Sequence, residues 1–176
     1  TALIPLGVRW FGLSTSLIGR DPALMDLMAK SGCTGLLIGF ESMSPAGLGT
    51  IDKRFYDPLL YAGLVKDRHR RGSTIQGCFV FGNDADTLDT FDATADFVIA
   101  SGIDLPRFAI LTPFPGTPLH ARLDREGRIL TKDWELYDGQ HVVFQPQGMT
   151  AAQLLAGHEH AWKRVYGWKP ILSRLR

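Results

Sequence analysis

The sequence has few cysteines, almost no net charge and no long apolar run. Its two cysteines, Cys33 and Cys78, stand far apart in the chain, so they cannot by themselves build a zinc or iron–sulfur site. The balance of 19 basic against 18 acidic residues excludes a strong electrostatic attraction to nucleic acid or to an anionic membrane. No stretch approaches the roughly 18 apolar residues of a membrane span, and no signal peptide is visible. These absences favour a cytoplasmic location.

Several signatures of nucleotide binding and catalysis are also missing. The chain has no GxGxxG segment, no P-loop and no G-x-S-x-G elbow, which excludes the usual phosphate cradles and the nucleophile elbow of hydrolases. His158 and His160 are two positions apart on a predicted helix and face different sides, so they cannot chelate one metal ion. His158 falls on the apolar stripe of that helix and is interpreted as a core residue. His69, His120 and His141 are isolated.

What the chain does contain is a repeated unit: a glycine, a short apolar strand, a polar tip, and a helix that begins at a capping residue. Gly32, Gly72 and Gly102 each introduce such a unit, and another strand precedes the first of them. Strand–helix alternation in phase predicts a parallel sheet with its polar tips at one end. Ligands of such sheets bind at the carboxyl ends of the strands. The predicted strands span residues 8–13, 35–40, 75–81 and 105–111.

Capping residues and prolines mark the predicted helix starts. These starts fall at Asp21-Pro22, Ser44-Pro45, Asp57-Pro58, Asp86-Thr87 and Thr117-Pro118, and a capping box, Thr150 with Gln153, opens the last helix. The pattern changes after residue 127, where we expect a turn at 138–139 followed by a short strand. We therefore divide the chain into residues 1–127, with four strand–helix units, and residues 128–176, a C-terminal extension with a loop or short strand and a final helix.

Four strands in 176 residues fall short of a closed eight-stranded barrel, which needs about 250 residues. A doubly wound sheet of four strands and a partial barrel without its first units both satisfy the repeat. The chain has no initiator Met and reaches its first strand within a few residues. The partial barrel fits this abrupt start better, and we expect a piece of a longer polypeptide.

Three strand ends carry candidate ligand-binding residues. Glu41 follows a strand with no other charge, where a carboxylate commonly accepts the two hydroxyls of a ribose; the alternative is that it only caps nearby amides. At the next strand end, Asp86 is expected to cap a helix, which leaves Asn83 and Asp84 to meet a ligand. The third is the segment 112–118, whose three prolines and one glycine make a rigid loop. Its backbone is suited to reading the edge of a flat base, although a stiff turn with no ligand remains the alternative.

Three of these segments resemble consecutive strands of the radical S-adenosylmethionine (SAM) enzymes. Residues 31–42 resemble the fourth barrel strand of that family. Residues 77–82, followed by Asp86-Thr87, resemble the fifth strand with its Gly-x-x-x-x-Gly pattern, and residues 110–119 resemble the sixth strand and its loop. Asp133-Trp134 and residues 137–144 resemble the branch that often carries an N-terminal cobalamin-binding domain. The resemblance runs over nearly the whole chain and keeps the order of the family.

The resemblance implies an α/β fold in which this chain forms the C-terminal part of a partial (β/α)6 TIM-like barrel. It implies SAM and a [4Fe–4S] cluster as cofactors of the parent protein, and it leaves open whether cobalamin takes part. The resemblance assigns Glu41 to the ribose and Ser14 or Ser16 to the amino-acid part of SAM. It places the strand with Phe79 and Phe81 beside the adenine, whose edge would be read by the backbone of Leu111, Thr112 and Pro113. Asn83, at the end of the same strand as Phe81, is a candidate from its position alone.

One departure from the family is large. The C-x3-C-x2-C loop that holds the cluster is absent, and so is the glycine-rich motif of the second strand; both would precede Thr1. We therefore expect a fragment that cannot cleave SAM alone and that self-associates through the exposed edge of its first strand. The leading hypothesis is a parent enzyme that uses SAM radical chemistry on an unknown small molecule, for methyl transfer or another C–H functionalisation. The alternatives are a non-catalytic α/β module that binds a nucleoside-like small molecule, and a scaffold without a ligand.

Overall fold

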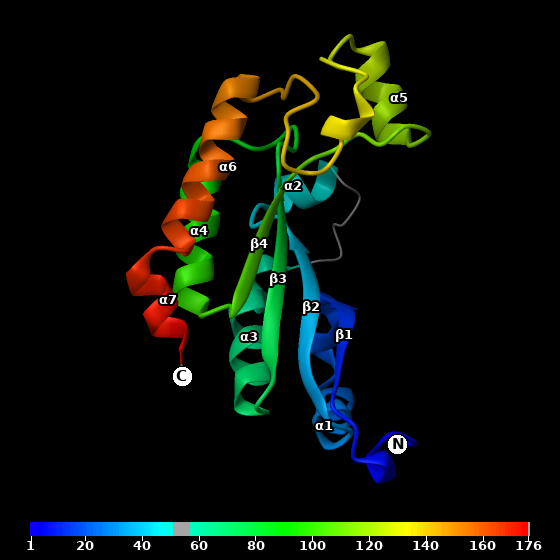
Figure 1. The fold of residues 1–176 in the computed structure, drawn as a ribbon, viewed down its shortest axis with the longest axis vertical. Helices are drawn as coiled ribbons and strands as arrows, with labels where there is room; N and C mark the ends of the chain where they lie inside the picture. The colour runs from blue at the N-terminus through cyan, green and yellow to red at the C-terminus, as the bar shows by residue number, and fades with distance from the viewer. Residues whose placement is uncertain (51–56, 176) are drawn as a thin grey trace.

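A four-stranded parallel sheet forms the centre of the computed structural model, which describes residues 1–50 and 57–175 (Figure 1). The strands pair in chain order, β1-β2-β3-β4, and every pair is parallel. Their carboxyl ends therefore lie at one edge of the sheet, as the repeat predicts. The strands are β1 (Trp10–Thr15), β2 (Cys33–Glu41), β3 (Thr74–Phe81) and β4 (Leu105–Ile110).

Seven helices of the described residues follow or flank these strands. They are α1 (Pro22–Lys30), α2 (Pro45–Thr50), α3 (Tyr61–Arg70), α4 (Asp89–Ser101), α5 (Pro118–Arg125), α6 (Ala151–Val165) and α7 (Trp168–Arg174). Short 3-10 helices lie at Ile4–Leu6, Ser16–Arg20, Pro58–Leu60 and Trp134–Leu136. Helices α2 and α5 lie toward the carboxyl ends of the strands (Figure 1).

One face of the sheet is covered by helices and the other is open. Helices α1, α3 and α6 pack on β2, β3 and β4, and side chains beneath them, such as Ile38 and Phe40, are fully buried. On the opposite face Leu13 is 80% exposed and Leu105 is 52% exposed. A doubly wound sheet carries helices on both faces, whereas a barrel carries them on the outside only. The winding is therefore that of part of a barrel, and the predicted α/β fold class is confirmed.

The covered face is built from aromatic side chains of three neighbouring strands. The ring centroids of Phe40 and Phe79 are 5.4 Å apart, and those of Phe79 and Phe108 are 5.9 Å apart. The Tyr61 hydroxyl donates a 2.9 Å hydrogen bond to the Phe40 carbonyl oxygen, so the one polar atom of that ring is paired. Rings spaced in this way add to the stabilisation that their buried area gives.

Several predicted boundaries are confirmed and a few shift. Asp21 caps α1 through a 2.8 Å bond from the Leu24 amide, and Thr150 and Gln153 form the predicted capping box of α6. The first strand begins at Trp10 rather than at residue 8. Asp57 caps a turn of 3-10 helix before α3 begins. Pattern and cap residues thus locate the elements, while the structure sets their ends.

The C-terminal extension joins the same core as the strands. Helix α6 packs on α4 and on β4, and its Leu154, Ala161 and Val165 belong to the main hydrophobic cluster. The turn expected at 138–139 is present, with Gly139 at φ 77°, and the Gly139 carbonyl accepts a 2.7 Å bond from the Ile110 amide. The short strand expected after it reduces to a single antiparallel bridge between Ile129 and Phe144.

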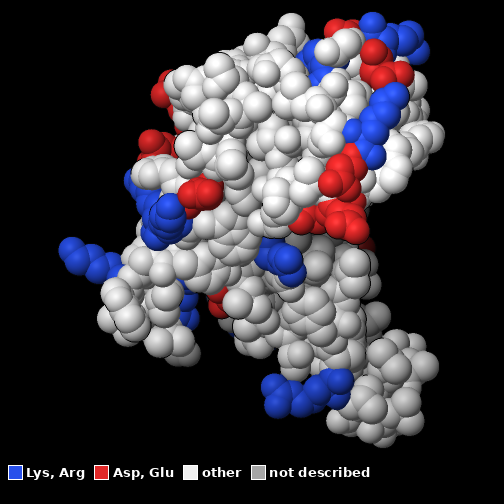
Figure 2. Space-filling model, turned by 45° about the horizontal axis from the view of Figure 1, so that its top comes forward, with Lys and Arg blue, Asp and Glu red and all other residues white. Residues whose placement is uncertain are grey.

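On the surface, charges of both signs are mixed. On the face shown in Figure 2, basic and acidic side chains are interspersed rather than gathered by sign, as the near-zero net charge leads one to expect. Among the helices of the described residues, none is long and apolar enough to cross a membrane.

Candidate functional site

The open face of the sheet is hollowed near the carboxyl ends of β1, β2 and β3. The hollow has a volume of about 430 Å³ and is lined by Leu13, Ser14, Thr15, Leu37, Gly39, Glu41 and Cys78. Two of the sequence-predicted residues, Glu41 and Ser14, are therefore brought together here. We call this surface the Glu41 hollow.

Glu41 has an unusual backbone, which determines where its carboxylate lies. It is the only non-glycine residue with positive φ in the described chain, at 65°, and the pairing of β2 with β3 shifts register between Gly39 and Glu41. A left-handed conformation costs a residue with a Cβ about 1–2 kcal/mol. Strain of this kind clusters at functional sites.

The Glu41 carboxylate lies over the backbone of Gly39. A Cβ atom added at Gly39 would stand only 2.7 Å from Oε1 and 3.3 Å from Cδ of Glu41. Gly39 is thus the shelf on which the carboxylate rests, and a larger residue would displace it. The sequence showed Glu41 as a strand-end carboxylate, but it gave no sign of this shelf.

Cys78 and Arg107 continue the open face beyond Gly39. The strand register pairs Gly39 with Cys78 and Cys78 with Arg107. Burial raises the pKa of the Cys78 thiol, the charge of Arg107 lowers it, and the charge of Glu41 raises it. Cys78 stands in the middle of β3 and is partly exposed. Sequence reasoning missed Arg107, although its alternation with the apolar Phe108 and Ile110 was a usable signal.

Ser14 and Ser16 occupy different surroundings. Ser14 lies in β1 and lines the Glu41 hollow, with its hydroxyl 3.3 Å from the Thr15 carbonyl oxygen. Ser16 begins the 3-10 helix that follows the strand and is not among the residues that line the hollow. Of the two serines, only Ser14 is among the residues that line the hollow.

The side chains of Phe79 and Phe81 lie away from the open face, while the expectation that their strand flanks the adenine stays a prediction. Both are 1% exposed, and they pack among Phe40, Phe91 and Phe108 on the helix-covered face. Alternation along β3 places Cys78 and Val80, not the phenylalanines, on the open face.

Asn83 is also turned away from the open face. Its side chain is buried, and its amide nitrogen lies 3.2 Å from the Val80 carbonyl oxygen. Asp84 is occupied as well, because it pairs with Arg122 at 2.5 Å and with Arg128 at 2.9 Å. Burial opposes ionisation of Asp84, but the bonds from Arg128 and Arg122 keep the pKa of its carboxyl below the usual value.

Asp86 does not cap a helix, contrary to the prediction. Helix α4 begins three residues later, at Asp89, and the buried Asp86 carboxylate instead accepts bonds from the amides of Gly82 at 2.8 Å and Asn83 at 3.0 Å. Burial raises the pKa of Asp86 in spite of these two bonds. Asp86 therefore fixes the backbone just after β3.

The proline-rich loop begins where β4 ends, at the same edge of the sheet as Glu41. The Leu111 amide donates to the Phe81 carbonyl oxygen at 2.8 Å, and the Phe114 amide donates to that of Thr112 at 3.0 Å. The Thr112 hydroxyl turns back to the Ile110 carbonyl oxygen at 3.0 Å, and Pro113 is buried. These bonds hold the backbone of Leu111, Thr112 and Pro113 in a fixed shape.

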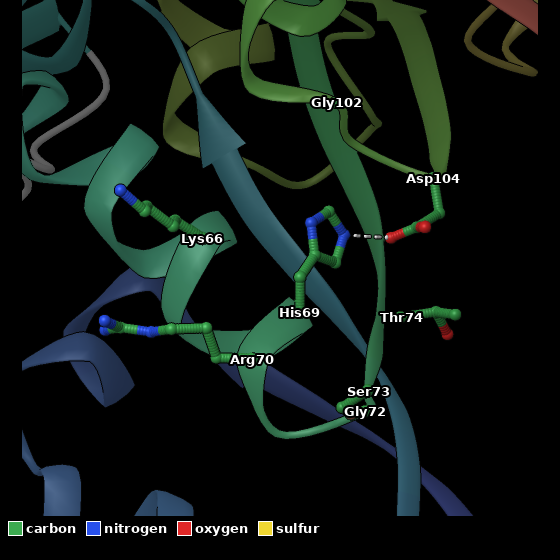
Figure 3. A pocket seen from close by; sticks show the side chains of 8 residues that line it. All are labelled: Lys66, His69, Arg70, Gly72, Ser73, Thr74, Gly102 and Asp104. Atoms are coloured by element: carbon green, nitrogen blue, oxygen red, sulfur yellow. Dashed lines mark hydrogen bonds and ion pairs between the residues drawn. The ribbon is translucent and has the colours of Figure 1, made fainter. Parts of the chain in front are cut away.

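The histidines and the second cavity do not add to this site. His158 is buried, with Nε2 3.2 Å from the Phe108 carbonyl oxygen and 3.0 Å from Nε1 of Trp162, which confirms it as a core residue. A cavity of about 470 Å³ lies at the opposite end of the sheet, beside the start of β3. There the His69 and Asp104 side chains point toward each other and pair at 2.8 Å (Figure 3).

The described residues do not fit an iron–sulfur cluster. They contain no group of three His, Cys, Asp or Glu side chains placed to hold a metal ion. Cys33 is buried at the start of β2, whereas Cys78 lies on the open face. The described residues therefore lack the three thiolates that would bind such a cluster.

The comparisons with known proteins agree with the resemblance seen in the sequence. A family model described as a domain of unknown function, DUF4070, matches residues 117–176. The bacteriochlorophyllide d C-12(1)-methyltransferase of Chlorobaculum tepidum is 34% identical over 97% of this chain and 37% of its own length. The C-8(2)-methyltransferase of the same organism is 30% identical over 88% of this chain and 35% of its own length. The chain thus spans about a third of the length of these relatives.

A solved structure shares the fold. The radical S-adenosylmethionine methyltransferase TsrM from Kitasatospora setae, with cobalamin and a [4Fe–4S] cluster bound, matches 90% of this chain and 30% of its own chain. The TM-score is 0.60 and the sequence identity is 21%. The sequence relatives and the shared fold together confirm the resemblance to part of a radical SAM core.

Proposed function

We propose that this chain supplies the ribose and adenine side of the SAM site in a larger radical SAM methyltransferase. The observation that carries the proposal is the Glu41 carboxylate, held over Gly39 by a left-handed backbone at the carboxyl end of a central strand. The relatives support the reaction type, because both are methyltransferases by name. The proposed reaction is methyl transfer to a small molecule or another functionalisation of one of its C–H bonds.

Each part of SAM has a place in this arrangement. The two oxygens of Glu41 would accept hydrogen bonds from the two ribose hydroxyls. The backbone of residues 111–113 follows β4, which lies two strands from β2. Neighbouring strands are about 4.8 Å apart, so the separation is roughly 10 Å, comparable to the length of a nucleoside. Ser14, on the β1 side of Glu41, would meet the amino-acid part.

The remaining cofactors belong to the proposed parent protein. When bound, SAM supplies either a methyl group or, after reductive cleavage, a carbon radical. We propose that the parent holds its [4Fe–4S] cluster with cysteines outside this chain, because the described residues have no seat for one. The present chain should therefore bind the nucleoside part of SAM without cleaving it. Cobalamin is proposed as a further cofactor of the parent, since it is bound in the TsrM structure.

The test is recognition of the ribose diol. We would measure binding of adenosine and of 2′-deoxyadenosine to this chain by ligand-observed NMR, with Glu41→Gln as the variant and Glu135→Gln as the matched control. Glu135 is exposed on the short helix Trp134–Leu136, away from the hollow. A hydrogen bond to a charged group contributes about 1.5–3 kcal/mol, so the unmodified chain should prefer adenosine by roughly tenfold or more.

The expected pattern is that Glu41→Gln removes most of this preference and Glu135→Gln keeps it. Equal binding of the two nucleosides by the unmodified chain would refute the ribose assignment. Binding that prefers adenosine but ignores Glu41→Gln would move the nucleoside to another place on the molecule.

A further inference from the structure

One polar row crosses the open face of the sheet. The strand register aligns four residues side by side in this row: Thr15, Gly39, Cys78 and Arg107. The row nearer the amino ends is mostly apolar, with Leu13, Leu37, Gln76 and Leu105. On the other side, Val80 pairs with Ala109. The row therefore holds the Arg107 cation and the Cys78 thiol side by side, and the Glu41 carboxylate lies over its third member, Gly39. The rest of the open face is largely apolar.

Arg107 is the arginine of the row on the open face of β4. Its neighbours in β4, Pro106 and Phe108, are buried under the helices, and Arg107 itself is exposed on the open face. Over the described residues, Arg107 makes no ion pair, whereas Arg71, Arg122, Arg128 and Arg164 each contact a carboxylate. A guanidinium presents a planar fork of donors that fits a carboxylate through two parallel hydrogen bonds.

Glu41 does not neutralise Arg107, because a strand separates them. Gly39 and Arg107 lie on either side of Cys78 in the register, and the charges of Glu41 and Arg107 act on the Cys78 thiol in opposite directions. The open face thus presents a carboxylate suited to hydroxyl donors and, one strand beyond the thiol, a cation suited to an anionic acceptor.

We propose that Arg107 binds the carboxylate of the methyl-accepting substrate and so selects for acidic substrates. This inference rests on the proposed function, in which the nucleoside of SAM lies at Glu41 and its amino-acid part lies on the β1 side. Arg107 is on the opposite side of Glu41, on β4. The amino-acid part of SAM, which carries its carboxylate, lies on the far side of Glu41, so a carboxylate bound at Arg107 belongs to a second ligand. Arg107 is a specificity-determining residue in this arrangement.

Cys78 serves as a reporter of the charge beside it. We would compare its alkylation by iodoacetate, which is an anion, with its alkylation by neutral iodoacetamide, and read each cysteine separately by peptide mass spectrometry. The ratio of the two rates cancels the thiolate fraction and reports how strongly the site attracts an anion. Cys33 is buried and provides an internal standard for unfolding.

The variants are Arg107→Gln, Arg107→Lys and the matched control Arg125→Gln, which removes an exposed arginine at the end of α5. A unit charge about 4 Å away changes the local concentration of an anion by about fivefold at the dielectric constant of water, which sets a lower bound for the expected effect. The iodoacetate-to-iodoacetamide ratio at Cys78 should fall by at least this factor in Arg107→Gln. Arg107→Lys and Arg125→Gln should keep it. An unchanged ratio in a folded Arg107→Gln would overturn the proposal.

The second arm identifies the source of the carboxylate. Pyropheophorbide a, a chlorin with one free propionic acid, stands in for the bacteriochlorophyllide that the relatives' names give, and its methyl ester removes the charge. The acid should protect Cys78 from iodoacetamide more strongly than the ester, and Arg107→Gln should abolish the difference. S-adenosylhomocysteine and 5′-methylthioadenosine, of which only the first carries the amino-acid part with its ammonium and carboxylate groups, should both protect Cys78 without dependence on Arg107.

The outcomes separate the two proposals. Protection by S-adenosylhomocysteine that requires Arg107, with no difference between the chlorin acid and its ester, would overturn the substrate assignment and give the carboxylate to SAM. The unmodified chain could fail to prefer adenosine over 2′-deoxyadenosine and still be protected at Cys78 more strongly by the chlorin acid than by its ester. That result would refute the role of Glu41 and leave an anion site at Arg107. Equal protection by acid and ester in every variant would overturn the inference.

Discussion

Gly39→Ala separates the position of the Glu41 carboxylate from the stability of the sheet. The added Cβ would lie 2.7 Å from Oε1 of Glu41, and its next contact, at 3.3 Å, is Cδ of the same side chain. Both atoms belong to a flexible side chain, so the carboxylate can swing away while the backbone stays in place. Gly39 is not among the residues with positive φ, so alanine fits its conformation.

The expected change in the free energy of unfolding is therefore small. Replacing glycine by alanine at a compatible position stabilises a protein by about 0.4–1 kcal/mol, through the lower entropy of the unfolded chain, and moving the carboxylate offsets part of this. Urea denaturation should show a change within about 1 kcal/mol. Ligand-observed NMR should show that the preference for adenosine over 2′-deoxyadenosine is lost, because the carboxylate no longer lies over residue 39.

Gly63→Ala is the matched control. Gly63 lies in α3, where an added Cβ meets nothing within 4 Å, so the variant should gain up to about 1 kcal/mol and keep the nucleoside preference. A Gly39→Ala protein that still discriminates between the two nucleosides would refute the reasoning, because the shelf would then have no role in recognition.

Three further predictions follow from the packing. Gly157→Ala places a Cβ 2.3 Å from the Phe91 ring, between α6 and α4. This overpacking should lower the free energy of unfolding, measured by urea denaturation, by roughly 1–3 kcal/mol. A variant as stable as the unmodified chain, or more stable, would show that the two helices move apart freely. Burial lowers the pKa of His158, so the unfolded chain binds the additional proton as the pH falls below about 6.5. The midpoint of thermal unfolding should drop in that range, and His158→Gln should drop less; identical pH profiles would contradict this. Leu13 is 80% exposed on the edge strand β1, so Leu13→Lys should weaken the self-association that the sequence predicts through the exposed edge of this strand. Sedimentation velocity measures it, and an unmodified chain that is monomeric at every concentration would refute the prediction.

The local signals of the sequence were sufficient for the order and type of the elements. Glycines such as Gly32 and Gly102, at φ 89° and 72°, end helices because a left-handed residue is needed there. Asp21 and Thr150 begin helices because their side chains accept bonds from free amides. These are interactions between residues close in the chain, so the sequence displays them directly. Parallel pairing then followed from the alternation of strand and helix.

Which side of a strand faces the ligand was decided by the tertiary structure alone. In β3, apolar residues occupy both faces, so alternation separates Phe79 and Phe81 from Cys78 without showing which face the helices cover. The sequence also did not show which polar residues after β3 are available to a ligand. Asp86 turns inward to two backbone amides, and Asp84 is paired with two arginines that follow α4 in the chain. The shelf formed by Gly39 under Glu41 depends on a register shift between two strands. Covering, pairing and register are relations between segments distant in the sequence, and therefore only the folded chain specifies them.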